Sequence, residues 1–323
     1  MNRRSIMRLA LGAATLPLAA PALRAQTFDH PIRFIIPNAP GGTSDILARL
    51  MGPELTRTLG QNVVIENRTG AGGNIGADFV AKSPPDGHTI LLMDVTTLAT
   101  NPALFPRLSF KPADLAPVSM VIYAPYILGV ANALPVQDAA GLVAHAKAHP
   151  NTLNVANSGT GTSSHLTAVM LEDAWGTPMT HVPYRGGAPA LLAVTTGEAS
   201  MTMAGATQSL PFAVNNQMRA VAVTGPTRFA ALPQVPTFRE LGWPGVDAGT
   251  WQGALVAAGT PPVLINRLHA AMRDALAQPQ LAARLVDLGA TQRTDGPETF
   301  GNWLAEQTEA YTQLIRSHNI LTE

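Results

Sequence analysis

The sequence contains no cysteine, which excludes disulfides, thiolate catalysis and cysteine-based metal or cluster sites. It also lacks net charge, because 21 basic residues balance 21 acidic residues over 323 positions. Without a basic excess nothing indicates nucleic-acid binding, and without an acidic tract nothing indicates a disordered acidic tail. No apolar run reaches the roughly 20 residues that are needed to span a bilayer.

The first 25 residues indicate export. Arg3, Arg4 and Arg8 form a basic start, and residues 9–22 follow as an uncharged stretch rich in Ala and Leu. Together they predict a signal peptide that is cleaved near Ala25, and the paired arginines also fit the twin-arginine route as an alternative to the general one. We therefore expect a periplasmic protein. Removing this segment leaves 17 basic and 21 acidic residues, a net charge of −4, so an anion would have to bind through local donors.

The remaining chain repeats one unit, in which a short apolar run leads through a loop of small residues into an amphipathic segment. The apolar runs, which predict strands, are residues 32–36, 63–65, 89–93, 153–156 and 179–182. Strands that alternate with helices in this way predict parallel sheets with helical crossovers. The first predicted helix, residues 46–59, contains Pro53, where we expect a kink or a break.

The two ends of the chain are expected to share a lobe. Residues 126–250 carry their own strand–loop–helix units and form the second lobe, while residues 26–125 and 251–323 form the first. A lobe inserted in this way requires two chain crossings and allows a hinge between the lobes. The predicted fold class is therefore α/β, with each lobe a doubly wound, mainly parallel sheet.

One glycine-rich loop precedes the first helix and predicts an anion site. Ligands of doubly wound sheets lie where strands end and loops lead into helix N-termini. In residues 38–45, Gly41 and Gly42 allow close backbone approach, and Thr43 and Ser44 begin the helix. The partial positive charge of that helix end favours an anion. An ordinary capped turn would explain the same spacing, and from spacing alone it is the more common case.

A second loop, residues 68–76, contains several glycines without matching a nucleotide motif. The dinucleotide fingerprint requires glycine at relative positions 0, 2 and 5. Counting from Gly70, position 5 is Ile75, and the third glycine comes one residue late as Gly76. We therefore do not predict nucleotide binding.

Two loops of the second lobe offer polar groups that could face the first loop. Residues 157–165 contain several hydroxyls, and residues 181–187 add a phenol, a guanidinium and a Gly turn. Arg185 could pair with a carboxylate, although a solvated arginine fits the sequence equally well. His165 is expected to support its loop by hydrogen bonding rather than to contact the ligand.

Enzyme and metal signatures are not found in the sequence. It has no Gly-x-Ser-x-Gly elbow, no P-loop and no His-Glu-x-x-His. His145 and His149 have the spacing of a helical metal pair, but Pro150 follows and no carboxylate accompanies them, so a surface helix end is expected. Asp45, Asp94 and His181 could be imagined as a triad, yet nothing in the sequence brings them together. We predict no catalysis, no cofactor and no metal.

The chain resembles the extracytoplasmic receptors of tripartite tricarboxylate transporters, the Bug or TctC-like family. The matching segments follow the family's order and are residues 31–33, 40–45, 64–68, 70–76, 85–89, 158–166, 181–186, 232–237 and 258–261. The resemblance implies a two-lobed type II periplasmic-binding-protein fold that closes on a small organic acid. It also implies a di-/tricarboxylate or aromatic acid as ligand, membrane permease subunits as partners and a monomer. Delivery to a membrane sensor kinase, or an α/β enzyme acting on a small acid, are the alternatives.

Family positions place the ligand on the first loop and on the facing loops of the second lobe. The resemblance and the loop chemistry together predict a set of ligand-binding residues, supported by His165 and His181: Gly41, Gly42, Thr43, Ser44, Asp45, Thr96, Ser158, Gly159, Gly161, Thr162, Tyr184, Arg185 and Gly186.

The chain departs from the family pattern where acidic residues are usual. It has Ser200, Ala204 and Thr207 at positions that often carry an acid or a proline, and residues 94–97 differ from the usual Gly- and Asn-rich loop. The loss of acids near the cleft would remove a partner for an amine. This favours a plain carboxylate over an amino acid.

Overall fold

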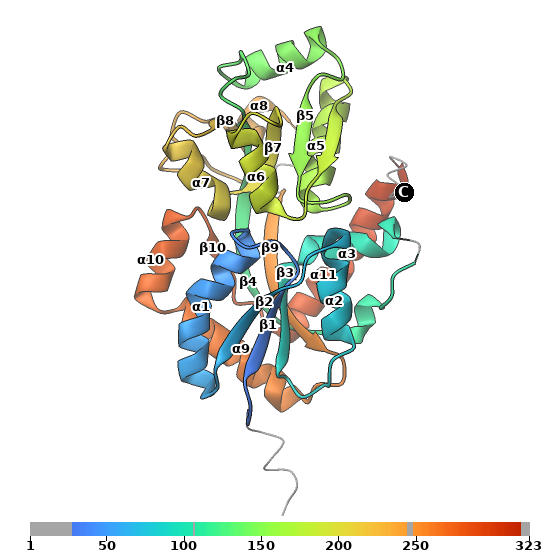
Figure 1. The fold of residues 1–323 in the computed structure, drawn as a ribbon, viewed down its shortest axis with the longest axis vertical. Coiled ribbons are helices and arrows are strands. Elements are labelled where there is room, and N and C mark those ends of the chain that lie inside the picture. Colours follow the sequence, from blue (N-terminus) through green and yellow to red (C-terminus); the bar gives the residue numbers. More distant parts are fainter. Residues whose placement is uncertain (1–27, 106, 244–247, 318–323) are drawn as a thin grey trace, which may run out of the picture.

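The structure, a computed structural model, describes residues 28–105, 107–243 and 248–317. It has two α/β lobes that share one continuous sheet (Figure 1). No helix in these ranges has both the length and the apolar character needed to cross a membrane. The predicted signal peptide, residues 1–25, lies outside the described residues.

The first lobe, at the bottom of Figure 1, contains both ends of the described chain. Its strands are β1 (Ile32–Ile36), β2 (Val63–Asn67), β3 (Thr89–Asp94), the first part of β4 (Leu115–Val130), β9 (Gly249–Ala257) and β10 (Thr291–Gln292). Its helices are α1 (Thr43–Leu59), α2 (Asn74–Ala81), α3 (Val95–Leu104), α9 (Pro262–Leu276), α10 (Pro279–Asp287) and α11 (Pro297–Ser317), with 3-10 turns η2 (Ala71–Gly73) and η3 (Pro112–Asp114).

The second lobe is built from the middle of the chain. Its strands are the end of β4, β5 (Asn154–Asn157), β6 (Thr180–Pro183), β7 (Met201–Gly205) and β8 (Arg219–Val223). Its helices are α4 (Ala139–Ala148), α5 (Ser163–Trp175), α6 (Gly187–Thr195), α7 (Ala206–Val214) and α8 (Phe238–Leu241).

The parallel pairs predicted from the repeated units are confirmed. In the first lobe β1 lies parallel to β2 and β3, and in the second lobe β5 lies parallel to β6 and β7. Antiparallel pairs are added by the long strand β4, which pairs with β9 and β10 in one lobe and with β7 and β8 in the other. The sheet is mixed because the strands that join the lobes run against their neighbours.

Strand β4 is the main connection between the lobes. Residues 115–125 of β4 pair with β9, and from Tyr126 onward β4 pairs with β7. The predicted lobe boundaries, after residues 125 and 250, fall at this change of partners and inside β9. A single extended strand that changes its pairing partners in this way leaves few backbone positions about which the lobes can rotate.

Each lobe is stabilised by its own buried apolar clusters. The first lobe buries Phe34 and Ile36 of β1 against Leu47, Met51 and Leu55 of α1. Helix α1 continues through Pro53 without the break that the proline predicted, because these buried side chains lie on both sides of it. The second lobe has its own apolar clusters around β4 and β7. A small apolar cluster of Leu104, Leu166 and Ile315 joins the lobes.

Phe300 anchors the start of α11 in the first lobe. Its side chain is fully buried among Ile35, Leu91 and Val95. We expect Phe300→Ala to lower the free energy of unfolding by about 3–5 kcal/mol, because it removes a buried ring and leaves a cavity. Val286→Ala in α10, where the side chain is 73% exposed, is the control and should change it by no more than about 0.5 kcal/mol. Urea unfolding measures both, and equal losses would contradict this packing.

Candidate functional site

Between the lobes lies a narrow cleft, which we call the inner cleft. It opens where the parallel strands of both lobes end and loops lead into helices, the usual ligand position in such sheets. The first lobe contributes Asn38, Gly42, Thr43, Ser44 and Thr97, and the second contributes Ser158, Thr162, Ser164, Thr202 and Gln208. Both lobes therefore present small polar residues to the same space.

Five of the described helices, α1, α2, α5, α6 and α7, begin at the inner cleft. Their N-cap residues make no side-chain cap hydrogen bond and are Gly42, Gly73, Thr162, Gly186 and Gly205. The first N–H groups of a helix have no partner within the helix, and they carry its partial positive charge. Without side-chain caps, the unpaired N–H groups among them can bind an anion from two opposed lobes. At α2 the N–H groups of Gly73 and Asn74 already donate to the carbonyls of Gly70 and Ala71.

Two of the glycines at these helix starts leave space for a neighbouring side chain, which would have to move if the glycine were replaced. A Cβ atom on Gly187 would lie 2.2 Å from Nε2 of Gln208, and one on Gly205 would lie 2.8 Å from Cγ2 of Thr250. Neither separation is sterically possible. The absence of side chains here allows Gln208 and Thr250 to reach the cleft wall.

Three hydroxyls form a compact cluster at the start of α5. The Oγ of Ser158 lies 2.9 Å from that of Ser164 and 3.2 Å from Oγ1 of Thr162, and the last two are 3.1 Å apart. Hydroxyl hydrogens can rotate to suit their acceptors. The hydroxyl of Thr162 donates to the carbonyl of Gly159 at 2.7 Å, so those of Ser158 and Ser164 are the ones that can turn a hydrogen toward an anion without moving a heavy atom.

Three direct hydrogen bonds join the lobes around the cleft. The N–H of Ala39 donates to the carbonyl of Arg185 at 3.2 Å, Oγ1 of Thr100 donates to the carbonyl of Gly161 at 3.0 Å, and Oγ of Ser163 donates to the carboxylate of Asp94 at 2.7 Å. With the apolar cluster at Leu104, they hold the two lobes in contact on one side of the cleft. The structure is a closed form of the two lobes.

The described residues that line the inner cleft include no lysine, arginine or histidine, and their one charged group is the carboxylate of Asp94. Asp94 caps α3 by accepting a hydrogen bond from the N–H of Thr96 at 3.1 Å, and it also accepts one from the N–H of Trp251 at 3.3 Å. Burial raises the pKa of Asp94, and the hydrogen bonds from Ser163, Thr96 and Trp251 offset only part of that effect.

Two phenols lie close to Asp94. The hydroxyl of Tyr126 is hydrogen-bonded to Oγ of Ser163, which in turn donates to Asp94. Burial, with the charge of Asp94 as a second cause, raises the pKa of Tyr126 and raises that of Tyr311 to about 12. Both phenols are therefore neutral donors at physiological pH.

A second space, the outer cleft, adjoins the inner cleft and shares Asn38, Gly72 and Ser158 with it. Basic side chains line only this outer part. The residues that are particular to it include Gly159, His165, His181, Tyr184 and Arg185. The exposed guanidinium of Arg185 makes no ion pair with any described residue, so it can attract an anion to the entrance without being buried on it.

His165 supports the loop before α5. Its Nδ1 accepts a hydrogen bond from the N–H of Gly161 at 3.0 Å, and its ring packs edge-to-face against His181. The Nε2 of His181 is 2.7 Å from the carboxylate of Glu172. Burial, and to a smaller extent His181, lowers the pKa of His165 to about 4. The His165 ring is therefore neutral at pH 7 and serves as an acceptor for the loop.

The structure brings most of the predicted ligand-binding residues to the two clefts. The inner cleft contains Gly42, Thr43, Ser44, Ser158 and Thr162, and the outer cleft contains Gly159, Tyr184 and Arg185 with the supporting His165 and His181. Their roles as ligand contacts remain predictions.

The other predicted residues lie behind the cleft walls. The carboxylate of Asp45 is held by Arg49 at 2.9 Å and by the N–H of Gly41 at 2.9 Å, so both residues brace the first loop from behind. Thr96 lies in the first turn of α3 and is buried. Gly161 and Gly186 lie at contacts between the lobes, where a Cβ would meet Leu104 at 2.1 Å and the N atom of Ala39 at 3.2 Å.

Several cleft residues were not predicted as ligand contacts. Tyr126, Thr250 and Gln252 come from the strands that cross between the lobes, and Gln208 comes from the first turn of α7. Gln252 accepts a hydrogen bond from Oγ of Ser44 at 2.7 Å, which fixes the direction of that hydroxyl. The crossing segments were recognisable in the sequence, and because both crossings border the cleft, their polar side chains could have been proposed.

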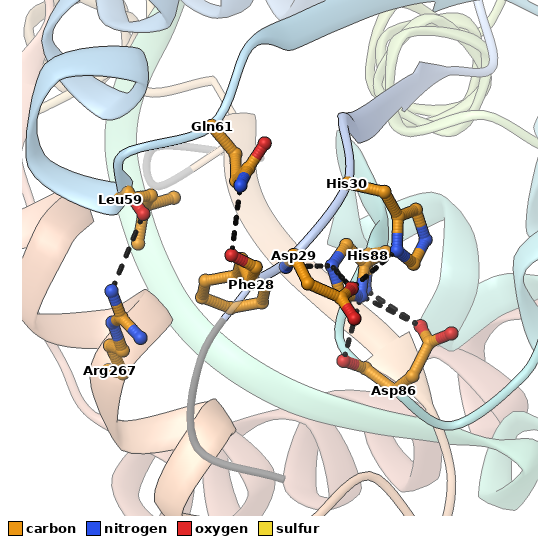
Figure 2. A network of polar contacts seen from close by, with 8 residues as sticks. All are labelled: Phe28, Asp29, His30, Leu59, Gln61, Asp86, His88 and Arg267. Carbon is orange, nitrogen blue, oxygen red and sulfur yellow. Dashed lines mark hydrogen bonds and ion pairs between the residues drawn. The ribbon is translucent and has the colours of Figure 1, made fainter. Parts of the chain in front are cut away.

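A separate polar cluster lies before β1, at the opposite end of that strand from the first loop, and fixes the start of the described chain (Figure 2). The N–H of Asp29 donates to Nε2 of His88 at 3.3 Å, and the His30 and His88 rings stack with centroids 3.6 Å apart and planes 6° apart. Asp29, His30 and His88 have potential metal-ligand atoms within 4.8 Å of one another. In stacked rings, however, the in-plane lone pairs run side by side instead of converging on one ion, so we assign this cluster an anchoring role.

Comparison with known proteins relates the chain to one family. A family model described as "Tripartite tricarboxylate transporter family receptor" matches residues 47–320. Protein BugT of Bordetella pertussis is 32% identical over 306 residues, covering 94% of each chain.

Solved structures show the same fold. The periplasmic binding protein BugD superposes with a TM-score of 0.87 at 30% identity, covering 91% of this chain and all of BugD. MatC from Rhodopseudomonas palustris, solved with bound malate, superposes with a TM-score of 0.84 at 31% identity, covering 89% of this chain and 99% of MatC.

The lowered pKa of His165 predicts a dependence of stability on pH. Between pH 6.5 and about 4 the unfolded chain binds a proton at this position that the folded protein does not. Stability should therefore fall as the pH is lowered through this window, by up to about 3 kcal/mol. His165→Asn, in which Oδ1 can replace Nδ1 as acceptor, should reduce that loss in urea unfolding at pH 7 and pH 4.5. His149→Asn, at an exposed histidine, is the control, and an unchanged pH dependence in His165→Asn would show the assignment to be wrong.

Proposed function

The chain belongs to the family of tripartite tricarboxylate transporter receptors, and from this premise we propose that it captures a small organic carboxylate between its lobes and delivers it to membrane permease subunits. Members of this family are solute-binding receptors. The class of ligand is supported by MatC, a structural relative that was solved with malate. The export signal predicted in residues 1–25, with cleavage near Ala25, and the periplasmic relative BugD support a periplasmic location.

The observation that carries this proposal is the inner cleft itself. Uncapped starts of α1 and α2 face those of α5, α6 and α7, and the hydroxyl cluster at Ser158, Thr162 and Ser164 lies among them. N–H and hydroxyl donors stabilise a carboxylate through several charge-assisted hydrogen bonds. Because both lobes supply donors, binding of the carboxylate would be coupled to closure of the lobes.

The same geometry supports binding without turnover. The hydroxyl that donates to the cleft-wall carboxylate of Asp94, that of Ser163, does so directly, with no imidazole between them. His165 turns its acceptor nitrogen to the N–H of Gly161, and so it is not available as a base at Ser163. A hydroxyl without an activating base is a weak nucleophile. We therefore propose that the bound acid is released unchanged.

Gly42 tests the anion site directly. Its φ of −74° and ψ of 168° are accessible to any residue, and an added Cβ would approach Oε1 of Gln208 at 3.8 Å, inside the cleft. We expect Gly42→Val to fold but to place two methyl groups where the carboxylate binds. An acid supplied at a concentration of 100 times its Kd for the wild type should raise the free energy of unfolding by about 2.7 kcal/mol. This gain should disappear in the variant.

The control for Gly42→Val is Gly52→Ala in the same helix, where the new Cβ would make an ordinary 3.7 Å contact with Ile65. Thermal unfolding with a panel of di-, tri- and aromatic carboxylates measures the ligand-induced gain in all three proteins. Gly52→Ala should retain the gain. If Gly42→Val also retains it, the first loop is not part of the site.

A further inference from the structure

The carboxylate of Asp94 lies in the wall of a cleft that binds anions under the proposed function. It is half-buried, it lies at the end of β3, and its two oxygens accept hydrogen bonds from the N–H of Thr96, the N–H of Trp251 and the hydroxyl of Ser163. Its hydrogen-bonding capacity is therefore largely used. What Asp94 lacks is a counter-charge.

No described residue supplies that counter-charge. Asp94 forms no ion pair with any of them, and the inner cleft has no basic side chain in its lining. The guanidinium of Arg293 stacks on the ring of Trp251, at 5.4 Å from its centroid, and is paired with Asp295. The neighbouring phenols of Tyr126 and Tyr311 are neutral. The helix starts of α3 and α5 both lie at Asp94, yet burial still raises its pKa, so they compensate its charge only in part.

A ligand that carried only carboxylates would add negative charge beside this unpaired one. Like charges in a partly dehydrated site repel strongly, because the local dielectric constant is low. A ligand with an ammonium group would instead pair with Asp94, and its carboxylate could still bind the uncapped helix starts. A hydroxyl on the ligand would supply a donor but no charge, and donors are already present at Asp94.

We propose that Asp94 is a specificity-determining residue that selects a ligand with an ammonium group in addition to its carboxylate, an inference that rests on the proposed function. This inference departs from the plain carboxylate that the sequence favoured on the basis of Ser200, Ala204 and Thr207, because Asp94 supplies an acid in the cleft wall itself. The selection is electrostatic: the cleft binds one negative end through neutral donors and one positive end through one carboxylate.

The test uses acids that share a carbon skeleton and differ in one substituent. Aspartate, malate and succinate carry an ammonium, a hydroxyl and a hydrogen at the same carbon, and glutamate, 2-hydroxyglutarate and glutarate form the corresponding five-carbon set. Isothermal titration with the mature protein, refolded from denaturant to remove any retained solute, gives the Kd of each. In the skeleton that fits, we expect the amino acid to bind roughly 10- to 100-fold more tightly than the unsubstituted acid.

Asp94→Asn should remove this preference. Its Oδ1 can still accept from Thr96 and Trp251, and its amide can donate to Ser163, so the closed form keeps its contacts. The ratio of the two Kd values should fall to within about threefold of one, since a charged pair becomes a neutral one. Ser163→Ala is the matched control. It removes the inter-lobe hydrogen bond but leaves the charge, so it should weaken all three acids by a similar factor and leave the ratio unchanged.

These measurements separate a failure of the inference about Asp94 from a failure of the proposed function. If wild-type protein binds succinate or malate as tightly as aspartate, and glutarate or 2-hydroxyglutarate as tightly as glutamate, Asp94 does not select an ammonium and the inference is overturned while the proposed function stands. The same holds if the ratio survives in Asp94→Asn. If no member of either set and no acid of the wider carboxylate panel binds at millimolar concentration, the proposed function itself is wrong.

Discussion

The N–H groups at the starts of helices that face one another across the cleft are the donors on which the rest of the arrangement depends. They exist because the parallel strands of both lobes end at the same space, so that α1, α2, α5, α6 and α7 all begin there. They remain available because no side chain caps these helices. These donors can bind a buried anion without a buried cation. A buried cation would be unfavourable in the empty protein, because it would lose its water without gaining a partner.

The same donors explain why the site is divided between two lobes. Each lobe has its own apolar core, and the contacts that join the described parts of the two lobes around the cleft include three hydrogen bonds and one small apolar cluster. If these contacts break, β4 and β9 are the strands about which the lobes would separate. A ligand that bridges the two sets of helix starts adds the contacts that favour the closed form.

Much of this arrangement could be predicted from the sequence. For the parts that were not predicted, the cause can be named residue by residue. Apolar runs and glycine loops predicted the strands and helix starts, because they depend on local periodicity and on backbone geometry. The partner of Asp45 could have been predicted, since Arg49 follows four residues later on α1, which is the spacing of a helical ion pair, and holds the carboxylate at 2.9 Å. The environment of Asp94 could not be predicted, because the donors Ser163 and Trp251 are distant in sequence and because it takes the described structure to show that no described residue forms an ion pair with it.

The central claim is that an anion is held by backbone and hydroxyl donors of both lobes. A crystal structure of the mature protein with a bound acid tests it most directly. The account predicts a carboxylate in the inner cleft, with its oxygens within about 3.2 Å of N–H groups at the start of α1 and of donors at the start of α5. A carboxylate paired instead with Arg185 in the outer cleft, with the inner cleft filled only by water, would contradict it.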